Sequence, residues 1–221
     1  GCQFSKGIQC VDTTFVGLAD FYEAEFLSEQ LFERTDFLGI TVFSNTIFRE
    51  KVTWLYNKVS SDTIISFESA EFEQALDISR ANFFCRLRFW NVQVHNPIPD
   101  NHTAYSVSKG KSHRIENGNQ SYEGLKTLRE SYRIIKQEFL KEGNSIDYLR
   151  FKALEMKVYE RELVENLFEN KSRDRFILWL SKISNKFGQD WLRALGFTLF
   201  VAFITHIIVH LVLLGKLSLV T

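Results

Sequence analysis

Two histidines near the C-terminal end of the chain are the residues whose type and spacing point most directly to chemistry. His206 and His210 are four residues apart, so on a helix they share one face. They lie within residues 194–214, which contain no Asp, Glu, Lys or Arg. Ionisable side chains inside a membrane face a partner helix or an aqueous path and are functional candidates. The alternative is a pair of neutral imidazoles that hydrogen-bond to a neighbouring helix or to nearby backbone.

The remaining histidines and the cysteines favour structural interpretations. His95, His102 and His113 fall in a polar stretch and lack the cysteine partners and close spacing of zinc ligands, so we expect solvated loop side chains. Three cysteines are too few for a disulfide scaffold, and the odd number fits a reducing compartment. We expect Cys10 and Cys85 to be buried structural thiols.

A metal site is one interpretation of four glutamates in the second helical stripe, Glu155, Glu160, Glu162 and Glu165. A solvated helix face paired with nearby Lys and Arg is the favoured interpretation. The chain also lacks G-x-G-x-x-G, P-loop, G-x-S-x-G and H-E-x-x-H motifs. We therefore expect no enzyme activity, no cofactor and no metal site.

The N-terminal part of the chain carries apolar residues at a period of five. This period fits neither a helix nor a strand. The period slips by one residue at several places. The expected centres are Phe21, Phe26, Leu31, Phe37, Phe67, Phe72, Phe83 and Phe89. A small or apolar residue often lies two positions before a centre, as Ala70 does before Phe72.

A coil with four sides of five residues satisfies this period. Each side turns one large apolar residue inward, twenty residues make one turn, and successive turns stack at about 4.8 Å. Asn57 and Asp62 fall on centre positions, so we expect residues 54–62 to bulge or to form a loop. The alternative is a Phe-rich β-sandwich, which is disfavoured because residues 11–94 contain only two Gly and no Pro.

The units Ala19-Asp20-Phe21, Ala70-Glu71-Phe72 and Ala81-Asn82-Phe83 resemble the repeat of the pentapeptide-repeat family. The resemblance covers roughly residues 10–94. It implies a right-handed quadrilateral β-helix, which we assign to residues 1–95. Some soluble members of the family mimic DNA toward a topoisomerase, and some membrane members continue into a channel-like module of two helices.

Residues 96–120 contain both prolines of the chain and many polar residues, and we expect a linker there. Residues 121–170 then carry two apolar stripes at helical spacing on either side of Gly143, a candidate helix C-cap, with Asn144 or Ser145 as the next N-cap. These stripes predict an antiparallel helical hairpin. The stripe residues are Leu125, Leu128, Tyr132, Ile135, Phe139, Ile146, Leu149, Ala153, Met156 and Leu163.

A membrane segment is expected at the end of the chain. Residues 171–190 predict an amphipathic helix at the membrane surface, and residues 191–215 a spanning helix. Trp191 lies at the entry, with Lys186 and Arg193 beside it. More basic residues precede the span than follow it, so the positive-inside rule predicts a cytoplasmic N-terminal part, in a bacterial inner membrane. The chain begins at Gly1 and its only methionine is Met156, so we expect a fragment or a processed product.

The net charge of zero hides two opposed parts. Residues 1–95 hold 8 Lys and Arg against 13 Asp and Glu, whereas the rest of the chain has an excess of basic residues. The balance argues against a nucleic-acid-binding protein. These features predict a non-enzymatic, membrane-anchored scaffold that contacts lipid, an unidentified protein partner and, as a further candidate, a second copy. The alternatives are a cytoplasmic domain of a channel or transporter, and a DNA mimic that binds a topoisomerase.

Overall fold

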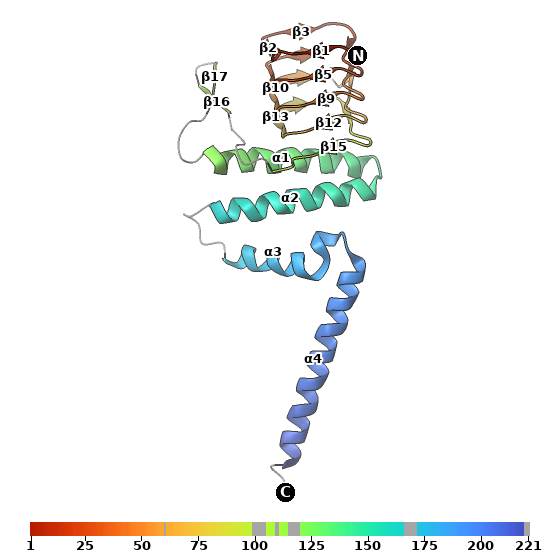
Figure 1. Cartoon of the computed structure of the whole chain (residues 1–221), viewed down its shortest axis with the longest axis vertical. Helices are drawn as coiled ribbons and strands as arrows, with labels where there is room; N and C mark the ends of the chain where they lie inside the picture. The colour runs from red at the N-terminus through yellow and green to blue at the C-terminus, as the bar shows by residue number, and fades with distance from the viewer. Residues whose placement is uncertain (60, 99–104, 109–110, 115–119, 166–171, 219–221) are drawn as a thin grey trace. The chain divides into compact units, whose positions relative to one another are not determined.

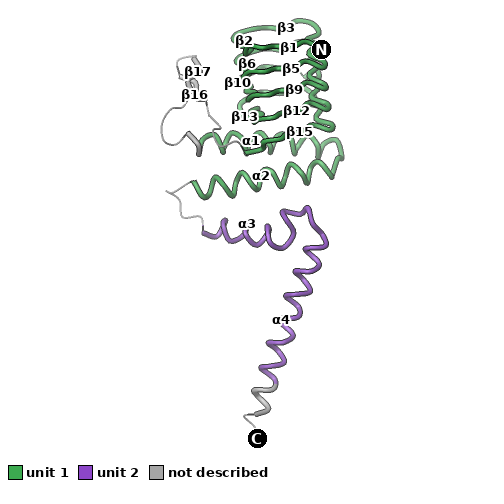
Figure 2. Tube along the Cα trace, viewed as in Figure 1, with its two compact units in different colours: residues 1–170 green, residues 171–221 purple. Residues whose placement is uncertain are grey.

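The computed structural model of the chain describes residues 1–59, 61–98, 105–108, 111–114, 120–165 and 172–218. It consists of two compact units, residues 1–170 and 171–221 (Figure 2). In the first unit a coil of short parallel strands is followed by two helices that share its hydrophobic core. The second unit contains two helices joined by a tight elbow.

The coil is a parallel β-solenoid of about four turns (Figure 1). One sheet contains β1 (Gln3–Phe4), β5 (Glu25–Phe26), β9 (Ile47–Phe48), β12 (Glu71–Phe72) and β15 (Gln93–Val94). A second contains β2 (Gln9–Val11), β6 (Gln30–Glu33), β10 (Val52–Val59), β7 (Asp36–Phe37), β3 (Thr14–Phe15) and, paired with β10, β13 (Leu76–Phe83). The third contains β14 (Arg86–Arg88), β11 (Ile64–Ser66), β8 (Thr41–Val42) and β4 (Ala19–Asp20).

The expected turn of twenty residues is wrong. Paired strands place Phe4 beside Phe26 and Phe26 beside Phe48, so a turn takes 22 residues. The reason lies in the sides, which alternate between five and six residues from one inward residue to the next. One turn is longer: Phe48 pairs with Phe72, 24 residues on.

The five-residue sides turn a corner through one residue with positive φ, except the side from Ile78 to Phe83, which lies within the continuous strand β13. At these corners the φ angle lies between 46° and 55° although none of the residues is glycine. The six-residue sides pass their corners without such a residue. The corner residues are Asp12, Glu23, Arg34, Asn45, Tyr56, Ser69 and Asn91.

The expected repeat centres occupy different environments. Five of them are buried in the solenoid: Phe26, Phe37, Phe67, Phe72 and Phe89. Phe21 and Phe83 are half-buried and pack against the same core. Leu31 is also half-buried, while its neighbour Phe32 is only 1% exposed.

Phenylalanines stack directly from turn to turn in the solenoid interior. Phe4, Phe26, Phe48 and Phe72 form one column, with ring centroids 4.8, 5.0 and 4.9 Å apart. A second column contains Phe21, Phe43, Phe67 and Phe89, with centroids 4.9, 5.3 and 5.3 Å apart. These centroid distances match the separation of neighbouring strands. Each ring therefore stacks on the ring at the equivalent position of the next turn.

The expectation of a bulge or loop over residues 54–62 is confirmed in part, because the pairing of β10 with β13 shifts register between Thr53 and Leu55 and again between Leu55 and Lys58. Residues up to Val59 form β10, and the side chains of Trp54 and Asn57 are fully buried. Asn57 fills the small inward position and donates through Nδ2 to the carbonyl oxygens of Phe32 and Thr35. The Nδ2 donor is therefore satisfied by backbone of the preceding turn, whereas the buried Oδ1 has no hydrogen-bond partner.

Two helices, α1 (Gln120–Lys141) and α2 (Ser145–Glu165), complete the first unit. Gly143 between them has a φ of +74°, and the Asn144 N–H donates to the Phe139 carbonyl at 2.9 Å, which is a Schellman C-cap. Asn144 Oδ1 then accepts from the Asp147 N–H at 3.2 Å and caps α2. Both expected caps are confirmed.

Helix α1 covers the last turn of the solenoid (Figure 1). Phe139 packs against Phe89, and the Ser131 hydroxyl accepts a hydrogen bond from the Ile78 N–H at 3.0 Å. The Tyr132 hydroxyl donates to the Pro97 carbonyl at 2.6 Å. These contacts satisfy apolar and polar groups that the end of a stacked coil otherwise exposes.

The region 96–120, expected to be a linker loop, contains one antiparallel strand pair. It is formed by β16 (Tyr105–Ser108) and β17 (Lys111–Arg114). Aromatic and β-branched residues such as Tyr105 and Val107 favour extended backbone, which the polar composition of the region obscures.

The second unit contains α3 (Ser172–Asn185), the short helix η1 (Lys186–Gly188) and α4 (Trp191–Ser218). Within α4, residues Trp191–Leu213 have a mean hydropathy of 2.2, and none of their most apolar window is buried in the protein. This is one helix long and apolar enough to cross a membrane, by its length and composition.

Candidate interaction surfaces

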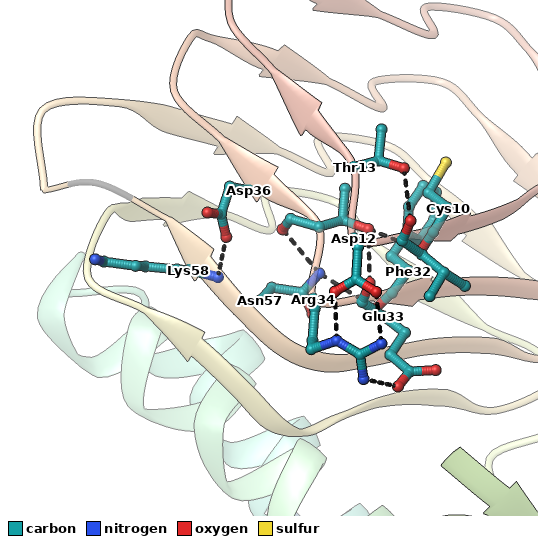
Figure 3. Close-up of polar contacts among 11 residues, drawn as sticks. Cys10, Asp12, Thr13, Phe32, Glu33, Arg34, Asp36, Asn57 and Lys58 are labelled. Carbon is teal, nitrogen blue, oxygen red and sulfur yellow. Dashed lines mark hydrogen bonds and ion pairs between the residues drawn. The ribbon is translucent and has the colours of Figure 1, made fainter. Parts of the chain in front are cut away.

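Several charged residues of the solenoid join its turns through ion pairs. Figure 3 shows Arg34 at a positive-φ corner, beside Asp12 of the preceding turn. Arg34 Nε donates to Asp12 Oδ1 at 2.5 Å, Arg34 Nη2 donates to Oδ2 at 2.7 Å, and Nη1 binds the buried Glu33 carboxylate. The hydrogen bond from Arg34 lowers the pKa of Asp12, so this carboxylate stays ionised in mildly acidic solution.

Arg49 joins three successive turns in the same way. Its guanidinium lies 2.6 Å from Glu25 on the preceding turn and also binds Glu73 on the following turn. The hydrogen bond from Arg49 is the main reason that the pKa of Glu25 is lowered. The acidic excess of the solenoid is therefore partly paired between turns instead of being presented as a continuous anionic surface.

A second corner of the solenoid is apolar and exposed. Val16, Leu18, Leu38 and Ile40 have exposed fractions of 75%, 68%, 53% and 52%, and we call these four residues the glycine-corner strip. They flank Gly17 and Gly39, which lie 22 residues apart on adjacent turns. A Cβ added to Gly39 would lie 2.2 Å from the Gly17 carbonyl oxygen, so the two turns approach closely here only because residue 39 is glycine.

This strip is not among the sites predicted from the sequence. The signal was the pair of triplets Val16-Gly17-Leu18 and Leu38-Gly39-Ile40, each an apolar residue on either side of a glycine. With a turn of twenty residues the triplets do not stack. With the observed turn of 22 residues they lie on adjacent turns, and an exposed apolar patch follows.

The glutamates of α2 do not all form the solvated face that was expected. Glu155 and Glu162 are buried, and their partners are on α1. Lys136 Nζ lies 2.5 Å from Glu155 Oε2, and Arg129 Nη1 lies 3.1 Å from Glu162 Oε2. The expectation holds for Glu165, which pairs with Arg161 along the same helix. No cluster of potential metal ligands occurs in the part of the chain that the structure describes.

Cys10, Cys85 and His95 can be placed among the described residues. Cys10 and Cys85 are half-buried, and burial raises the pKa of both, that of Cys85 to about 11. His95 is exposed, with Nε2 3.3 Å from Glu71 Oε2. The side chains of His102 and His113 lie outside the described residues.

In the second unit α3 exposes apolar residues. Phe176, Trp179, Leu180 and Ile183 recur at helical spacing with exposed fractions of 60%, 54%, 38% and 41%. The rings of Phe176 and Trp179 stack with centroids 5.9 Å apart. On the other side of the helix Leu178 is only 7% exposed. A helix on the surface of a water-soluble protein places polar residues on its exposed face, whereas the exposed face of α3 is apolar.

The elbow between α3 and α4 is held in an unusual backbone conformation. Lys186, Phe187 and Gly188 have successive φ values of 49°, 60° and 90°. The Phe187 side chain is buried, and the Gly188 N–H donates to Asn185 Oδ1 at 2.9 Å. Non-glycine residues adopt this region at a cost of about 1–2 kcal/mol each, so the buried ring and the cap must sustain the turn.

The remaining predicted membrane residues lie along α4. Trp191 is its first residue and is 73% exposed, and Arg193 is exposed beside it. The Asp190 carboxylate accepts from the Arg193 N–H at 2.9 Å and caps the helix. His206 and His210 are both exposed, with ring centroids 6.3 Å apart, so α4 presents them as one pair.

Comparison of the chain with protein families, with curated proteins and with solved structures finds no match. The surfaces above are therefore interpreted from their own chemistry.

Proposed function

We propose that this protein is a non-enzymatic scaffold anchored in a membrane by α4. The observation that carries the proposal is the glycine-corner strip, a set of exposed aliphatic side chains on a rod whose inward residues are packed. A stacked coil offers flat faces and edges to partners, and an aliphatic patch on such a face suits contact with another protein.

The finer architecture belongs to the same proposal. We interpret the solenoid as a right-handed quadrilateral coil of the pentapeptide-repeat type, and α1 and α2 as an antiparallel hairpin that caps it. The parallel stacking and the small residue two positions before many inward residues support this interpretation. The alternation of five- and six-residue sides departs from a uniform five-residue repeat.

Anchoring is tested by extracting membranes that contain the full chain with alkaline carbonate. We expect the protein to remain in the pellet. Leu199→Arg with Phe203→Arg should release it, because each arginine costs about 2.5–3.5 kcal/mol near the middle of a span. The matched control is Leu140→Arg with Ile146→Arg, two exposed apolar residues of the first unit, and this variant should stay in the pellet. Release of the wild-type chain would contradict the anchor.

The side of the membrane is tested with Cys2, which is exposed. The excess of basic residues before α4 predicts that the solenoid lies in the cytoplasm, and we place the protein in a bacterial inner membrane. A membrane-impermeant maleimide should label Cys2 only after the cells are permeabilised. Labelling of intact cells would reverse the orientation.

The scaffold role is tested by isolating the protein with its partners from detergent-solubilised membranes. We expect a defined set of partners for the wild-type chain and its loss in Leu18→Asp with Ile40→Asp. A matched control places the same charge at two exposed apolar positions elsewhere on the solenoid, as Phe84→Asp with Trp90→Asp, where the side chains are 68% and 62% exposed. Equal losses in the two variants would remove the strip from the proposal.

A second candidate function is a cytoplasmic domain of a channel or transporter, and one observation favours it. His206 and His210 lie side by side on α4, where two imidazoles suit a partner helix or an aqueous path. The DNA-mimic alternative is not favoured, because Arg34 and Arg49 pair with acidic residues of the solenoid.

A further inference from the structure

We infer that α3 binds the surface of a bilayer rich in anionic phospholipids, with its apolar face between the lipid chains and its basic residues at the headgroup phosphates. The inference rests on the proposed anchoring by α4 and goes beyond it, because it assigns a lipid class to a second element. The juxtaposition that carries it is an exposed apolar helix face, bordered by basic side chains, one elbow away from the apolar helix α4.

The apolar face is the first part of the argument. Phe176, Trp179, Leu180 and Ile183 lie at positions i, i+3, i+4 and i+7, which is one stripe along the central two turns of α3. A helix that lies in the plane of a membrane buries such a stripe about 5–10 Å below the headgroups. A tryptophan is suited to that depth, because its indole has an apolar body and a polar N–H.

The charges form the second part. Arg173, Arg175 and Lys182 are all exposed on α3, against the single acidic residue Asp174. Arg175 and Lys182 are seven residues apart and border Trp179 on the same edge of the stripe, whereas Arg173 lies on the other edge. Long basic side chains at the border of an apolar stripe reach outward to phosphates while their carbon chains remain among apolar groups. An anionic surface is complementary to this arrangement and a zwitterionic surface is much less so.

The position of α3 follows from the elbow. Because α4 begins three residues after Gly188, a spanning α4 brings the end of α3 to the membrane–water boundary. The strained turn at Lys186 and Phe187 prevents α3 from continuing the axis of α4. The apolar stripe of α3 then lies next to the lipid that surrounds α4. For this reason we infer that the stripe binds lipid and not a protein.

The test uses the full chain in vesicles of phosphatidylcholine alone and of phosphatidylcholine with about one third phosphatidylglycerol. Amide hydrogen exchange of α3 and of α4 is measured in both. We expect α4 to be protected in both vesicles and α3 to exchange at least about tenfold more slowly in the anionic vesicles. High salt should remove most of that difference, because it screens headgroup charge.

Substitutions test which basic side chains are responsible for the preference for anionic lipid. Arg175→Gln with Lys182→Gln should abolish the dependence on phosphatidylglycerol, whereas Arg133→Gln with Lys141→Gln, an equal loss of exposed charge on α1, should preserve it. Equal exchange of wild-type α3 in the two vesicles, with α4 protected, would overturn the inference and leave the anchor intact. Unprotected α4 in both vesicles would overturn the anchor and the inference with it.

Discussion

Gly39 shows how a single residue sets the shape of the solenoid. Its turn approaches Gly17 so closely that an added Cβ would meet the carbonyl oxygen of Gly17 at 2.2 Å, well inside contact distance. No comparable atom lies within 4 Å of a Cβ added to Gly17. The two glycines therefore look equivalent in the sequence but only one of them is required by packing.

We predict that Gly39→Ala destabilises the protein by about 1–3 kcal/mol, because backbone of two turns must separate to admit the methyl group. Gly17→Ala is the matched control and should change stability by less than about 0.5 kcal/mol. The free energy of unfolding in urea, followed by Trp fluorescence, measures both. Equal effects at the two positions would contradict the close approach of the turns.

The thiol of Cys85 provides a prediction with a defined pH dependence. Burial raises its pKa to about 11, so at neutral pH the unreactive protonated form dominates and the thiolate appears only as the pH rises toward 11. In a Cys2→Ser, Cys10→Ser variant, alkylation at pH 8 should be roughly a hundredfold slower than for an ordinary thiol with a pKa of about 8.5.

The rate at Cys85 should still rise about tenfold per pH unit up to about pH 10. The control variant keeps only the exposed Cys2, through Cys10→Ser and Cys85→Ser. A rate at Cys85 that levels off below about pH 9 would show that the thiol is not desolvated as its burial indicates.

At the scale of elements, the pairing of α1 with α2 depends on charges that are removed from water. Lys136 and Glu155 form an interhelical ion pair with side-chain exposures of 18% and 9%. Such a pair adds little net stability over an apolar pair, but removal of one partner leaves a buried charge uncompensated. It therefore fixes how the two helices align along their length.

We predict that Lys136→Met and Glu155→Leu each cost about 2–4 kcal/mol, whereas the double substitution recovers most of that loss. Arg133→Met is the control, because Arg133 and its partner Glu130 have side-chain exposures of 53% and 36%, and the substitution should cost less than about 0.5 kcal/mol. Thermal unfolding of the four variants measures the coupling. Additive losses in the double variant would exclude a direct pair.

The strands and helices can be predicted from the sequence more accurately than the register in which they pack. The period near five predicts a stacked coil, and Gly143 and Asn144 predict the helix caps, because these are local signals. The sequence predicts Leu31 as the inward residue, whereas the structure has Phe32 there. The difference arises because the length of a side depends on whether its corner has a residue with positive φ, and the residue type at Arg34 does not indicate one. Glu155 was expected in solvent because its partner, Lys136, is on another helix and cannot be inferred from the spacing within α2.

For the candidate surfaces, the apolar residues of α4 can be predicted from composition, whereas the glycine-corner strip can be predicted only if the length of a turn is known. Val16 and Leu38 come together only if 22 residues separate equivalent positions. If the length of each of two sides is predicted one residue too short, Val16 and Leu38 no longer lie at equivalent positions of adjacent turns. Tertiary register, and not residue type, was the missing information.

At the scale of the whole molecule, the solenoid and the first two helices share one hydrophobic core. Phe89 of the solenoid, Phe139 of α1 and Phe151 of α2 belong to a single buried cluster. Helices α3 and α4 form a separate unit. This division implies that the solenoid, α1 and α2 unfold together, whereas α4 in a detergent micelle keeps its helical hydrogen bonds.

We predict one thermal transition in detergent in which Trp54 fluorescence and about half of the helical signal are lost at the same midpoint. Trp54 reports the solenoid interior once Trp90, Trp179 and Trp191 are replaced by Phe. The fraction follows from the helix lengths, since α1 and α2 contain 22 and 21 residues and α3 and α4 contain 14 and 28.

Leu128→Ala tests the coupling, because Leu128 is a fully buried residue of α1. A cavity there costs about 2–5 kcal/mol and should lower both midpoints together by about 5–15 °C. Leu140→Ala is the control on the same helix, where the side chain is 62% exposed, and should leave both midpoints unchanged. If Leu128→Ala lowered only the helical midpoint and left Trp54 fluorescence unchanged, α1 would be an attached helix and not part of the solenoid core.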